Sequence, residues 1–447
     1  MSRRFAVVGG GIAGLAAAWE LRRRDPDAEV TVLEATGRLG GKLRTSAFAG
    51  RMVDEGADAF LARVPEGYDL CVELGLADAL VAPTSGRAYV AGGDDLHALP
   101  AGLVLGVPTD AAAVRATGWL GEDAADRVAA EPAQPLAPLG DDDAMSVGEL
   151  VRRRLGDEVL DRLVDPLIGG INAGDTDRLS LRAAAPQLAD AVATGTGLVA
   201  GLRDRPPPDA GPVFWAHPGG MAAVVDELVS HLRADGVDLR SLVPVTDLTA
   251  LLAGAGRDGV VVATPAPAAA RLVGGEAAEV LAALRHASVA LVSLALRPGE
   301  VTHPLDAGGL LVPRVEGRVL TACSFASTKW AHLAPAAGDD TVVLRASAGR
   351  FGAAAALDLD DDDLVAAVLA DLDDLLGLAG DPTEVRVNRW VDGFPQYEPG
   401  HLARLAAVEA DLAARLPLVR LAGAAHRGIG IPACIRQGRA AAAALTR

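Results

Sequence analysis

The stretch from Phe5 to Glu34 most constrains what this chain can fold into. An apolar run at 5–8 leads into Gly-Gly-Gly-Ile-Ala-Gly at 9–14, a helical pattern follows, and a second apolar run at 30–33 ends at the acid. This order of strand, glycine turn, helix, strand and acid is typical of a dinucleotide-binding βαβ unit. The glycines let the backbone approach a pyrophosphate, which the free N–H groups at the helix start can bind. Glu34 stands where a carboxylate can accept hydrogen bonds from an adenosine ribose.

The residues after Glu34 indicate which dinucleotide is bound. They read E-A-x-x-R-x-G-G, with Arg38 and Lys42 on either side of the two glycines, and resemble the FAD-binding start of the amine oxidase and protoporphyrinogen oxidase superfamily. Arginine and lysine can contact phosphate oxygens, and an acid at 34 argues against the 2′-phosphate of NADP. We therefore expect FAD rather than a plain glycine-rich turn. The predicted contacts here are Gly9, Gly10, Gly11, Ile12, Ala13, Gly14, Glu34, Ala35, Arg38, Gly41 and Lys42.

Composition excludes several classes of function. A net charge of −18 argues against a nucleic-acid partner or a polybasic lipid-binding face. The cysteines Cys71, Cys323 and Cys434 form no C-x-x-C pair, so we predict neither a disulfide frame nor a metal site. No apolar run reaches the roughly 18 residues of a membrane helix, so we expect a soluble, cytoplasmic protein without a transmembrane segment.

The remaining patterns place further elements along the chain. Ser146 and Glu149 have capping-box spacing at the start of an amphipathic helical region, 146–167. Apolar runs with strand character lie at 237–242, 245–251 and 259–265, and we expect the last of them, which closes with Thr-Pro, to return to the first sheet. A second group of apolar runs predicts a separate, more β-rich sheet: 287–296, 310–312, 319–325 and 341–347.

The C-terminal residues 421–438 carry the most specific resemblance. They match L-A-G-x-x-x-x-G-x-G-I-P-x-C-I-x-x-G, the closing motif of the protoporphyrinogen oxidase family. Gly428 and Gly430 permit a close backbone approach, and a helix beginning near Pro432 presents a second positive dipole end. The resemblance implies that Gly423, Ile429, Gly430 and Ile431 lie beside the flavin.

Other family segments extend the resemblance over essentially the whole chain. Residues 56–65 resemble G-P-D-S-F-L-x-R-K-P, although Ala57 replaces the proline and Val64 the lysine. The resemblance implies a flavin border made of Gly56, Ala57, Asp58 and Ala59. It also implies a backbone contact of Val245 to adenine. Trp390 would form a flavin wall, although a half-buried core aromatic is the simpler alternative.

The resemblance also implies an architecture and a reaction. We expect an α/β fold: a Rossmann-like FAD-binding domain, a β-rich mixed α+β substrate domain, and a helical domain that docks on lipid in membrane-bound relatives. Members of the family oxidise a porphyrinogen to a porphyrin, removing six electrons, and dioxygen reoxidises FAD to give hydrogen peroxide. The expected boundaries are 1–82, 213–275 and 385–447 for the FAD domain, 83–105 and 276–384 for the substrate domain, and 106–212 for the helical domain.

A porphyrinogen is a flat apolar ring with carboxylate arms, so its pocket needs an apolar centre and a cationic rim. Arg87 stands where the family places an arginine for a substrate propionate, and Arg63 and Arg345 are weaker candidates. Gly170 and Leu311 match residues near the ring. Ordinary exposed arginines and a core leucine are the plain alternatives. The hydride transfer needs positioning more than acid or base, so we predict no catalytic residue.

The sequence favours oxidation of coproporphyrinogen III to coproporphyrin III in heme biosynthesis, with the porphyrinogen and dioxygen as partners and ferrochelatase as a candidate receiver of the product. The choice depends on three features: the expected solubility, an amino-acid composition typical of a high-GC bacterial genome (much alanine and aspartate, and more arginine than lysine), and the G-I-P-x-C-I ending. Protoporphyrinogen IX is the alternative substrate. A flavin amine oxidase or carotenoid desaturase shares the N-terminal fingerprint, but amine oxidases frame the flavin with paired aromatics, and this chain has three tyrosines. A flavin-binding chaperone or regulator without turnover is the last alternative.

Overall fold

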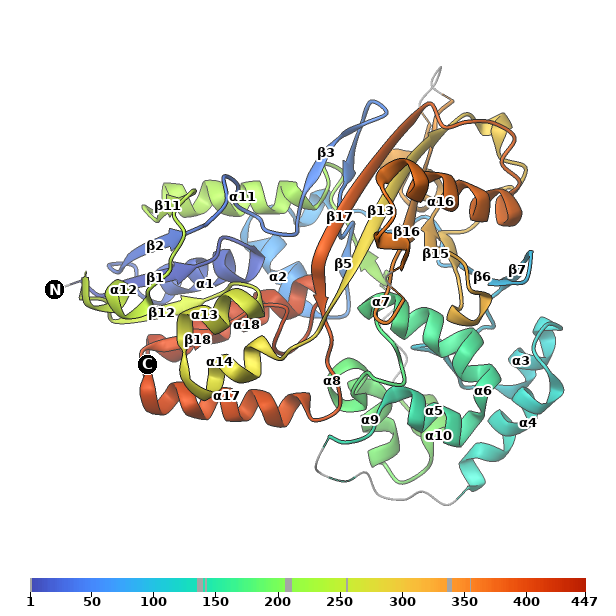
Figure 1. The fold of residues 1–447 in the computed structure, drawn as a ribbon, viewed down its shortest axis with the longest axis horizontal. Coiled ribbons are helices and arrows are strands. Elements are labelled where there is room, and N and C mark those ends of the chain that lie inside the picture. The colour runs from blue at the N-terminus through green and yellow to red at the C-terminus, as the bar shows by residue number, and fades with distance from the viewer. Residues whose placement is uncertain are drawn as a thin grey trace.

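The computed structural model describes residues 2–134, 140, 143–205, 211–254, 256–335, 340–353 and 355–447. Two large sheets and a group of helices form most of the described chain (Figure 1). Parts of the predicted helical segment 106–212 lie outside the described residues, namely 135–139, 141–142 and 206–210.

The first sheet is parallel and combines chain segments that lie far apart in the sequence. Within the described ranges it has five strands, β11 (Asp238–Arg240), β2 (Glu29–Leu33), β1 (Arg4–Val8), β12 (Gly259–Val262) and β18 (Val419–Leu421), in that order. The N-terminal strand therefore lies at the centre, between β2, which follows it directly in the sequence, and β12, which comes from the middle of the chain. All neighbouring strands in this sheet are parallel, so their C-terminal ends lie together at one edge of the sheet.

Helices cover both faces of this sheet. Phe5 and Val7 pack toward one group of helices, whereas Ala6 and Val8 pack toward the other. The first group is α1 (Ile12–Arg24), α2 (Pro65–Glu73), α11 (Met221–Ala234) and α18 (Ile431–Leu445), and the second is α12 (Leu248–Gly254), α13 (Ala266–Val273), α14 (Gly275–Ala282) and α17 (His401–Arg415). A parallel sheet buried on both faces is the predicted Rossmann-like arrangement.

The second sheet is mixed and mostly antiparallel. Its seven strands among the described residues are β17 (Glu384–Pro395), β13 (His286–Leu296), β16 (Val342–Ala348), β15 (Leu320–Ser324), β14 (Gly309–Leu311), β6 (Tyr89–Gly92) and β7 (Asp95–Ala98). Only the β14–β6 pair in this sheet is parallel. Helix α16 (Asp361–Leu376) covers one face, where its apolar stripe packs on alternate residues of β13 and β16. Residues on the other face line part of the cavity described below.

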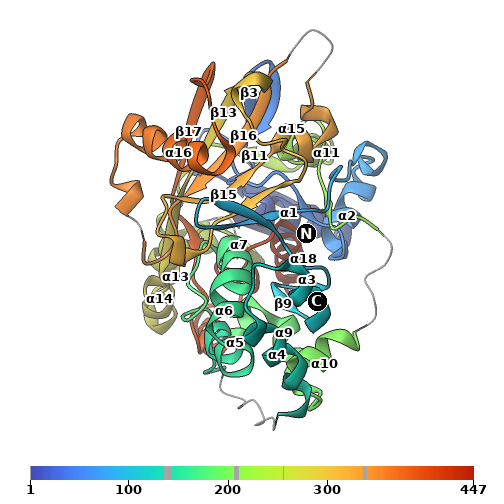
Figure 2. The same cartoon turned by 90° about the vertical axis from the view of Figure 1, so that its right-hand side faces the viewer.

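The helical region lies below the second sheet in the view of Figure 2. Ser146 caps α5 as predicted, because its Oγ accepts a hydrogen bond from Glu149 N at 3.1 Å. Beyond Gly156 the chain continues into a π-helix, Leu160–Gly169, which contains Pro166. The α-helices of the region are α3 (Ala111–Thr117), α4 (Glu122–Ala130), α5 (Val147–Leu155), α6 (Asp157–Val159), α7 (Gly170–Asn172), α8 (Leu181–Ala184), α9 (Pro186–Ala193) and α10 (Leu198–Arg203). None of the helices in the described parts is long and apolar enough to span a bilayer.

Short elements connect these bodies. They are β3 (Thr45–Phe48), β4 (Arg51–Asp54), β5 (Phe60–Leu61), β8 (Leu103–Val104), β9 (Val107–Pro108), β10 (Phe214–Trp215) and α15 (Ala326–Lys329). The β5–β10 pair joins residues 60–61 to 214–215, so two distant segments meet beside the first sheet.

The structure differs from the sequence prediction in two places. The strand predicted at 245–251 is wrong: residues 243–247 form no strand, and α12 begins at Leu248. Asp247 accepts a hydrogen bond from Ala250 N at 2.9 Å and so starts a helix, and the leucines at 248, 251 and 252 have helical spacing. Residues 385–395, assigned by sequence to the FAD domain, pair with β13 in the second sheet. The domain boundaries as a whole stay a prediction.

Candidate active site

A cavity of about 1300 Å³ lies where the two sheets and the helical region meet. One end is lined by the loops that follow β1, β2 and β12, at the carboxyl edge of the parallel sheet. The other end is lined by β13, β15, β16 and the segment 166–173. Crevices at the carboxyl edge of an open parallel sheet are where ligands bind in doubly wound folds. We call the loops 9–14, 34–42 and 423–431 the dinucleotide cradle, and the opposite end the substrate end.

Bare backbone forms the floor of the dinucleotide cradle. A Cβ on Gly41 would lie 3.1 Å from Gly11 Cα, and Gly40 N donates to Gly10 O at 2.7 Å. Helix α1 begins at Ile12 with no side-chain cap and no acid in its first turn, so its first N–H groups are open toward the cavity. These features fit the pyrophosphate of FAD. Gly14 serves packing instead, because its Cβ would lie 2.0 Å from Gly9 O.

Glu34 fixes the shape of the same loop. Its Oε2 accepts from Gly10 N at 2.8 Å, and its Oε1 accepts from Thr36 N and Thr36 Oγ1 at 2.8 and 2.7 Å. The carboxylate also lines the cavity, so its remaining lone pairs face the space where a ribose would lie.

The two predicted cations are partly engaged by loop carbonyls. Arg38 donates to Gly41 O at 2.7 Å and Leu43 O at 3.0 Å, and burial together with Arg44 lowers its pKa. Lys42 donates from Nζ to Gly393 O, and burial lowers its pKa. Both side chains line the cavity, so each can still turn toward a phosphate or the flavin.

The C-terminal motif supplies a second open helix start. Helix α18 begins at Ile431 with Gly430 before it and no side-chain cap. Tyr397 holds the loop that precedes it: its hydroxyl accepts from Gly428 N at 2.9 Å and donates to Ala424 O at 2.5 Å. The loop 423–429 therefore presents backbone to the cavity, and the two hydrogen bonds of Tyr397 hold it in place.

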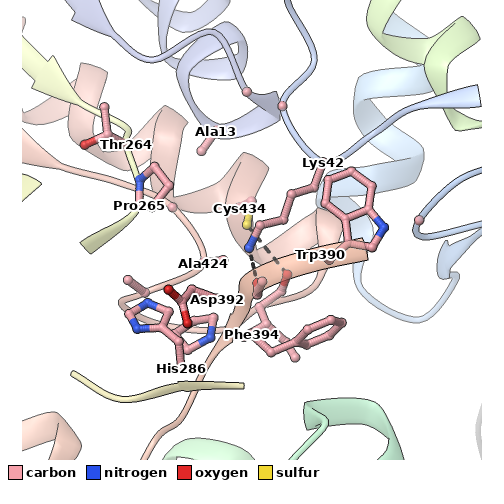
Figure 3. A pocket seen from close by; sticks show the side chains of 18 of the residues that line it. Ala13, Lys42, Thr264, Pro265, His286, Trp390, Asp392, Phe394, Ala424 and Cys434 are labelled. Atoms are coloured by element: carbon pink, nitrogen blue, oxygen red, sulfur yellow. Dashed lines mark hydrogen bonds between the residues drawn. The ribbon is translucent and has the colours of Figure 1, made fainter. Parts of the chain in front are cut away.

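Trp390 forms a side wall of the cavity. Its Nε1 donates to Glu55 O at 2.7 Å, and a Cβ on Gly56 would lie 3.3 Å from its ring. Figure 3 shows the ring beside Lys42. An indole held in this way gives a flat apolar surface next to the segment Gly56–Ala57.

Comparison with known proteins agrees with this geometry. Residues 12–446 match the model of the flavin containing amine oxidoreductase family. The chain belongs to this family. A coproporphyrinogen III oxidase of Mycobacterium tuberculosis is 40% identical over 444 residues, which cover 97% of this chain and 95% of the relative. One of Bacillus subtilis is 34% identical over 98% of this chain and 97% of the relative. The crystal structure of a proposed protoporphyrinogen oxidase from Exiguobacterium sp. 255-15 has a TM-score of 0.88 and 31% identity, covering 100% of this chain and 99% of that one.

Membership of the flavin containing amine oxidoreductase family confirms FAD as the cofactor and the chain as an FAD-dependent oxidoreductase. Most of the predicted FAD contacts line the cavity, but the contacts themselves stay a prediction. Those that line it are Gly9, Gly11, Ile12, Ala13, Glu34, Ala35, Arg38, Gly41, Lys42, Gly56, Ala57, Val245, Trp390, Gly423, Ile429 and Ile431. Those outside its lining are Gly10, Gly14, Asp58, Ala59 and Gly430.

Asp58 and Arg345 join the flavoprotein's segment 56–58 to the second sheet. Asp58 Oδ2 accepts from Trp330 Nε1 at 3.0 Å and lies 3.2 Å from both Lys329 Nζ and Arg345 Nη1. Burial alone would raise the pKa of Asp58, but the two cations and the indole N–H hold it below its usual value. Arg345 also donates to Gly56 O at 2.6 Å. This ion pair therefore holds the segment 56–58 against β16.

The structure places one of the predicted substrate residues in the cavity lining and the other four outside it. Gly170 lines the cavity, whereas Arg87, Arg63, Arg345 and Leu311 do not. The Arg87 side chain is 68% exposed and pairs with Asp306 at 3.0 Å. Arg63 is exposed, and Arg345 is occupied as described above. Leu311 is half-buried in β14, while the next residue, Val312, lines the cavity. Successive side chains of an extended segment point to opposite sides.

Sequence reasoning missed most of the substrate end. Period-two alternation in β13 could have found Val289 and Leu291, because the residues between them belong to the core under α16. No spacing pattern marks the polar residues, which come from separate strands and turns. The residues that it missed include Pro166, His286, Thr321, Ser347, Arg350, Asp392 and Phe394.

Proposed function

We propose that this enzyme oxidises coproporphyrinogen III to coproporphyrin III in heme biosynthesis, with FAD as the hydride acceptor and dioxygen as the final electron acceptor. The observation that carries the proposal is one cavity that connects the dinucleotide cradle to a slot walled by Trp390, Val289 and Leu291. A flat apolar ring fits such a slot. The 40% identity with a protein named coproporphyrinogen III oxidase over 97% of the chain supports the choice of substrate.

The proposed reaction balances in three equal rounds. In each round the substrate loses two electrons and two protons, and dioxygen takes them up as one molecule of hydrogen peroxide. Three rounds remove the six electrons and six protons that separate the porphyrinogen from the porphyrin. Bound FAD supplies an acceptor for the hydride at its isoalloxazine ring.

The chain's own contribution is positioning. Gly169 and Gly170 leave the approach to the ring free of side chains, since a Cβ at Gly170 would meet nothing within 4 Å. Val289 and Leu291 supply an apolar floor, and Trp390 supplies a wall. Holding the reacting carbon at van der Waals distance from the flavin can account for much of the rate without an acid or base. We therefore propose no catalytic side chain.

The proposal is tested by parallel rate measurements on coproporphyrinogen III and protoporphyrinogen IX. Porphyrin fluorescence reports the product, and an oxygen electrode with a peroxide assay reports the stoichiometry. We expect a higher kcat/KM for coproporphyrinogen III and three molecules of peroxide for each porphyrin. A clear preference for protoporphyrinogen IX would move the assignment to that substrate. Peroxide release from simple amines with neither porphyrinogen oxidised would favour an amine oxidase.

We also propose that the enzyme acts in the cytoplasm and passes its product to a ferrochelatase. No helix in the described parts could anchor it across a bilayer, and the charge of −18 opposes binding to anionic lipid. Cell fractionation tests the location. Transfer to a ferrochelatase is tested by asking whether metal insertion is faster with the coupled enzymes than with free coproporphyrin III at the same concentration.

A further inference from the structure

The substrate end of the cavity contains one cation that the sequence did not indicate. Arg350 follows β16 after Gly349, which has a φ of +86° and turns the chain there. Its side chain is only 11% exposed and lines the cavity. Nη2 donates to Val312 O at 3.1 Å, which fixes the guanidinium against the adjacent strand end.

Among the described residues, Asp165 is the carboxylate near Arg350, and Arg350 shares it with a second arginine. Asp165 Oδ2 lies 4.0 Å from Arg350 Nη1 and 3.9 Å from Arg314 Nε. Both distances exceed those of a good charge-assisted hydrogen bond. Asp165 is buried, and its other oxygen accepts from Thr176 Oγ1 at 2.8 Å. Two guanidinium groups therefore face one carboxylate, leaving an excess positive charge at the cavity wall.

Two buried polar atoms of this corner lack hydrogen-bond partners within the described chain. Neither Asp165 Oδ2 nor Arg314 Nε has a hydrogen-bond partner among the described residues. Burial and the charge of Arg314 lower the pKa of Arg350, and only Asp165 opposes them. An arginine remains charged in such a place, so the corner favours an anion that brings its own oxygen acceptors.

The corner belongs to the substrate end and not to the dinucleotide cradle. Phe351 N donates to Ala173 O at 2.8 Å, and Arg314 Nη2 donates to Gly174 O at 2.8 Å. The first bond attaches the segment around Arg350 to the turn that follows Gly169 and Gly170, and the second attaches Arg314 to the same turn. A ring lying over these glycines would extend its substituents toward Arg350.

We propose that Arg350 binds a carboxylate arm of the substrate and selects the more highly carboxylated porphyrinogen, while Arg314 and Asp165 position it. This inference rests on the function proposed above. Coproporphyrinogen III has four propionate arms and protoporphyrinogen IX has two, so a carboxylate site at this corner favours the first. A guanidinium fork also suits a carboxylate in two-point contact.

Two substitutions and a matched control test the proposal. Arg350→Met removes the charge and keeps much of the length, and Arg350→Lys keeps the charge but loses the fork. Arg178→Met is the control, because Arg178 stacks over Phe351 at 5.0 Å and pairs with Glu398 outside the cavity lining. Each holoenzyme is assayed for kcat/KM on both porphyrinogens and for the Kd of coproporphyrin III, measured by porphyrin fluorescence.

We expect Arg350→Met to lower kcat/KM for coproporphyrinogen III and to weaken coproporphyrin III binding by about ten- to a hundredfold. The effect on protoporphyrinogen IX should be several-fold smaller, with Arg350→Lys intermediate and the control unchanged. The tetramethyl ester of coproporphyrin III should bind wild type and Arg350→Met alike. The comparison of acid and ester remains informative if the variant loses part of its FAD, because both ligands are measured on the same preparation and differ only in their carboxylate charge.

The possible failures are distinguishable. If wild type oxidises coproporphyrinogen III but Arg350→Met changes all constants less than twofold, the role of Arg350 is overturned and the function stands. Equal losses on both porphyrinogens and on the ester would also overturn it, because a selective carboxylate contact cannot act on the ester. If wild type oxidises neither porphyrinogen, the proposed function fails, and the charge-dependent binding of coproporphyrin III still decides the role of Arg350.

Discussion

The two ends of the cavity are built from different parts of the polypeptide. The dinucleotide cradle is made mainly of backbone: facing glycines, two open helix starts and carbonyl groups, brought together from three distant segments. The substrate end is made of side chains on strands and on the turn after the π-helix. Backbone recognises what every dinucleotide shares, whereas side chains can be matched to one substrate. Added atoms should therefore be least tolerated where the cradle's backbone segments pack together, and the substrate end should accept changes that alter selectivity alone.

Gly14→Ala should give the largest effect, because it adds one methyl group where α1 packs against the glycine turn of the cradle. The new Cβ would lie 2.0 Å from Gly9 O, so the fingerprint loop must move. We expect a loss of about 3 kcal/mol or more in stability and a colourless, FAD-free protein. The flavin content of the purified protein and its Tm measure this outcome.

Gly254→Ala, in α12, is the matched control, because no described residue has an atom within 4 Å of its new Cβ. There the substitution should leave flavin content unchanged and raise stability by up to about 1 kcal/mol. A yellow Gly14→Ala protein with a wild-type Tm would show that the cradle is more adaptable than this comparison holds.

Arg345→Met tests the junction between the two ends. The side chain is buried and bonded to Gly56 O and Asp58, so its loss leaves that carboxylate with fewer partners and frees the flavin-side segment. We expect about 3 kcal/mol of destabilisation and weaker FAD binding, with KM little changed once FAD is saturating. A raised KM with normal FAD affinity would instead support the sequence prediction that Arg345 binds substrate.

Acidification should open the same junction. The pKa of Asp58 in the folded protein is held below its ordinary value of 3.8, so the unfolded chain binds more protons at this group in acid. The ion pair's contribution to folding stability is therefore complete above about pH 5 and is lost as the pH falls. Asp54 acts in the opposite sense between about pH 4 and 6, since burial raises its pKa to about 6. The comparison therefore uses Asp58→Asn against wild type.

The variant should be less stable at neutral pH, and its stability should fall less than that of wild type between about pH 5 and 3. Urea unfolding at a series of pH values gives the two curves. Parallel curves would exclude Asp58 as the source of the acid sensitivity.

Gly170→Ala is the counterpart of Gly14→Ala at the substrate end. Nothing in the described chain lies within 4 Å of the new Cβ, so we expect the protein to fold and to retain FAD. The methyl group enters the cavity where the ring would lie, and kcat/KM should fall about tenfold. Flavin content, Tm and kcat/KM measured together separate the two glycines. A colourless Gly170→Ala protein would contradict the division between the two ends.

The same division explains what the sequence could predict. The cradle depends on glycines at fixed spacing around strand and helix boundaries, so residues 9–14 and 421–438 were readable before the structure. Arg350 was not, because it reaches the cavity only through the pairing of β16 with its neighbours and through contacts with residues 165–176. The strand predicted at 245–251 failed for a local reason, since Asp247 starts a helix that an apolar run alone does not reveal.

Arg87→Met should give the smallest effect and tests the sequence's first choice of substrate cation. Arg87 is exposed, lies outside the cavity lining and pairs with Asp306, an ion pair that solvent screens. We expect less than about 1 kcal/mol of destabilisation and kcat/KM values within about twofold of wild type on both porphyrinogens. Measured beside Arg350→Met, this variant shows which of the two arginines binds the carboxylate. A large, selective loss with Arg87→Met would mean that the substrate extends beyond the cavity to the residues that precede β6 and β14. The substrate end would then include residues outside the present cavity lining.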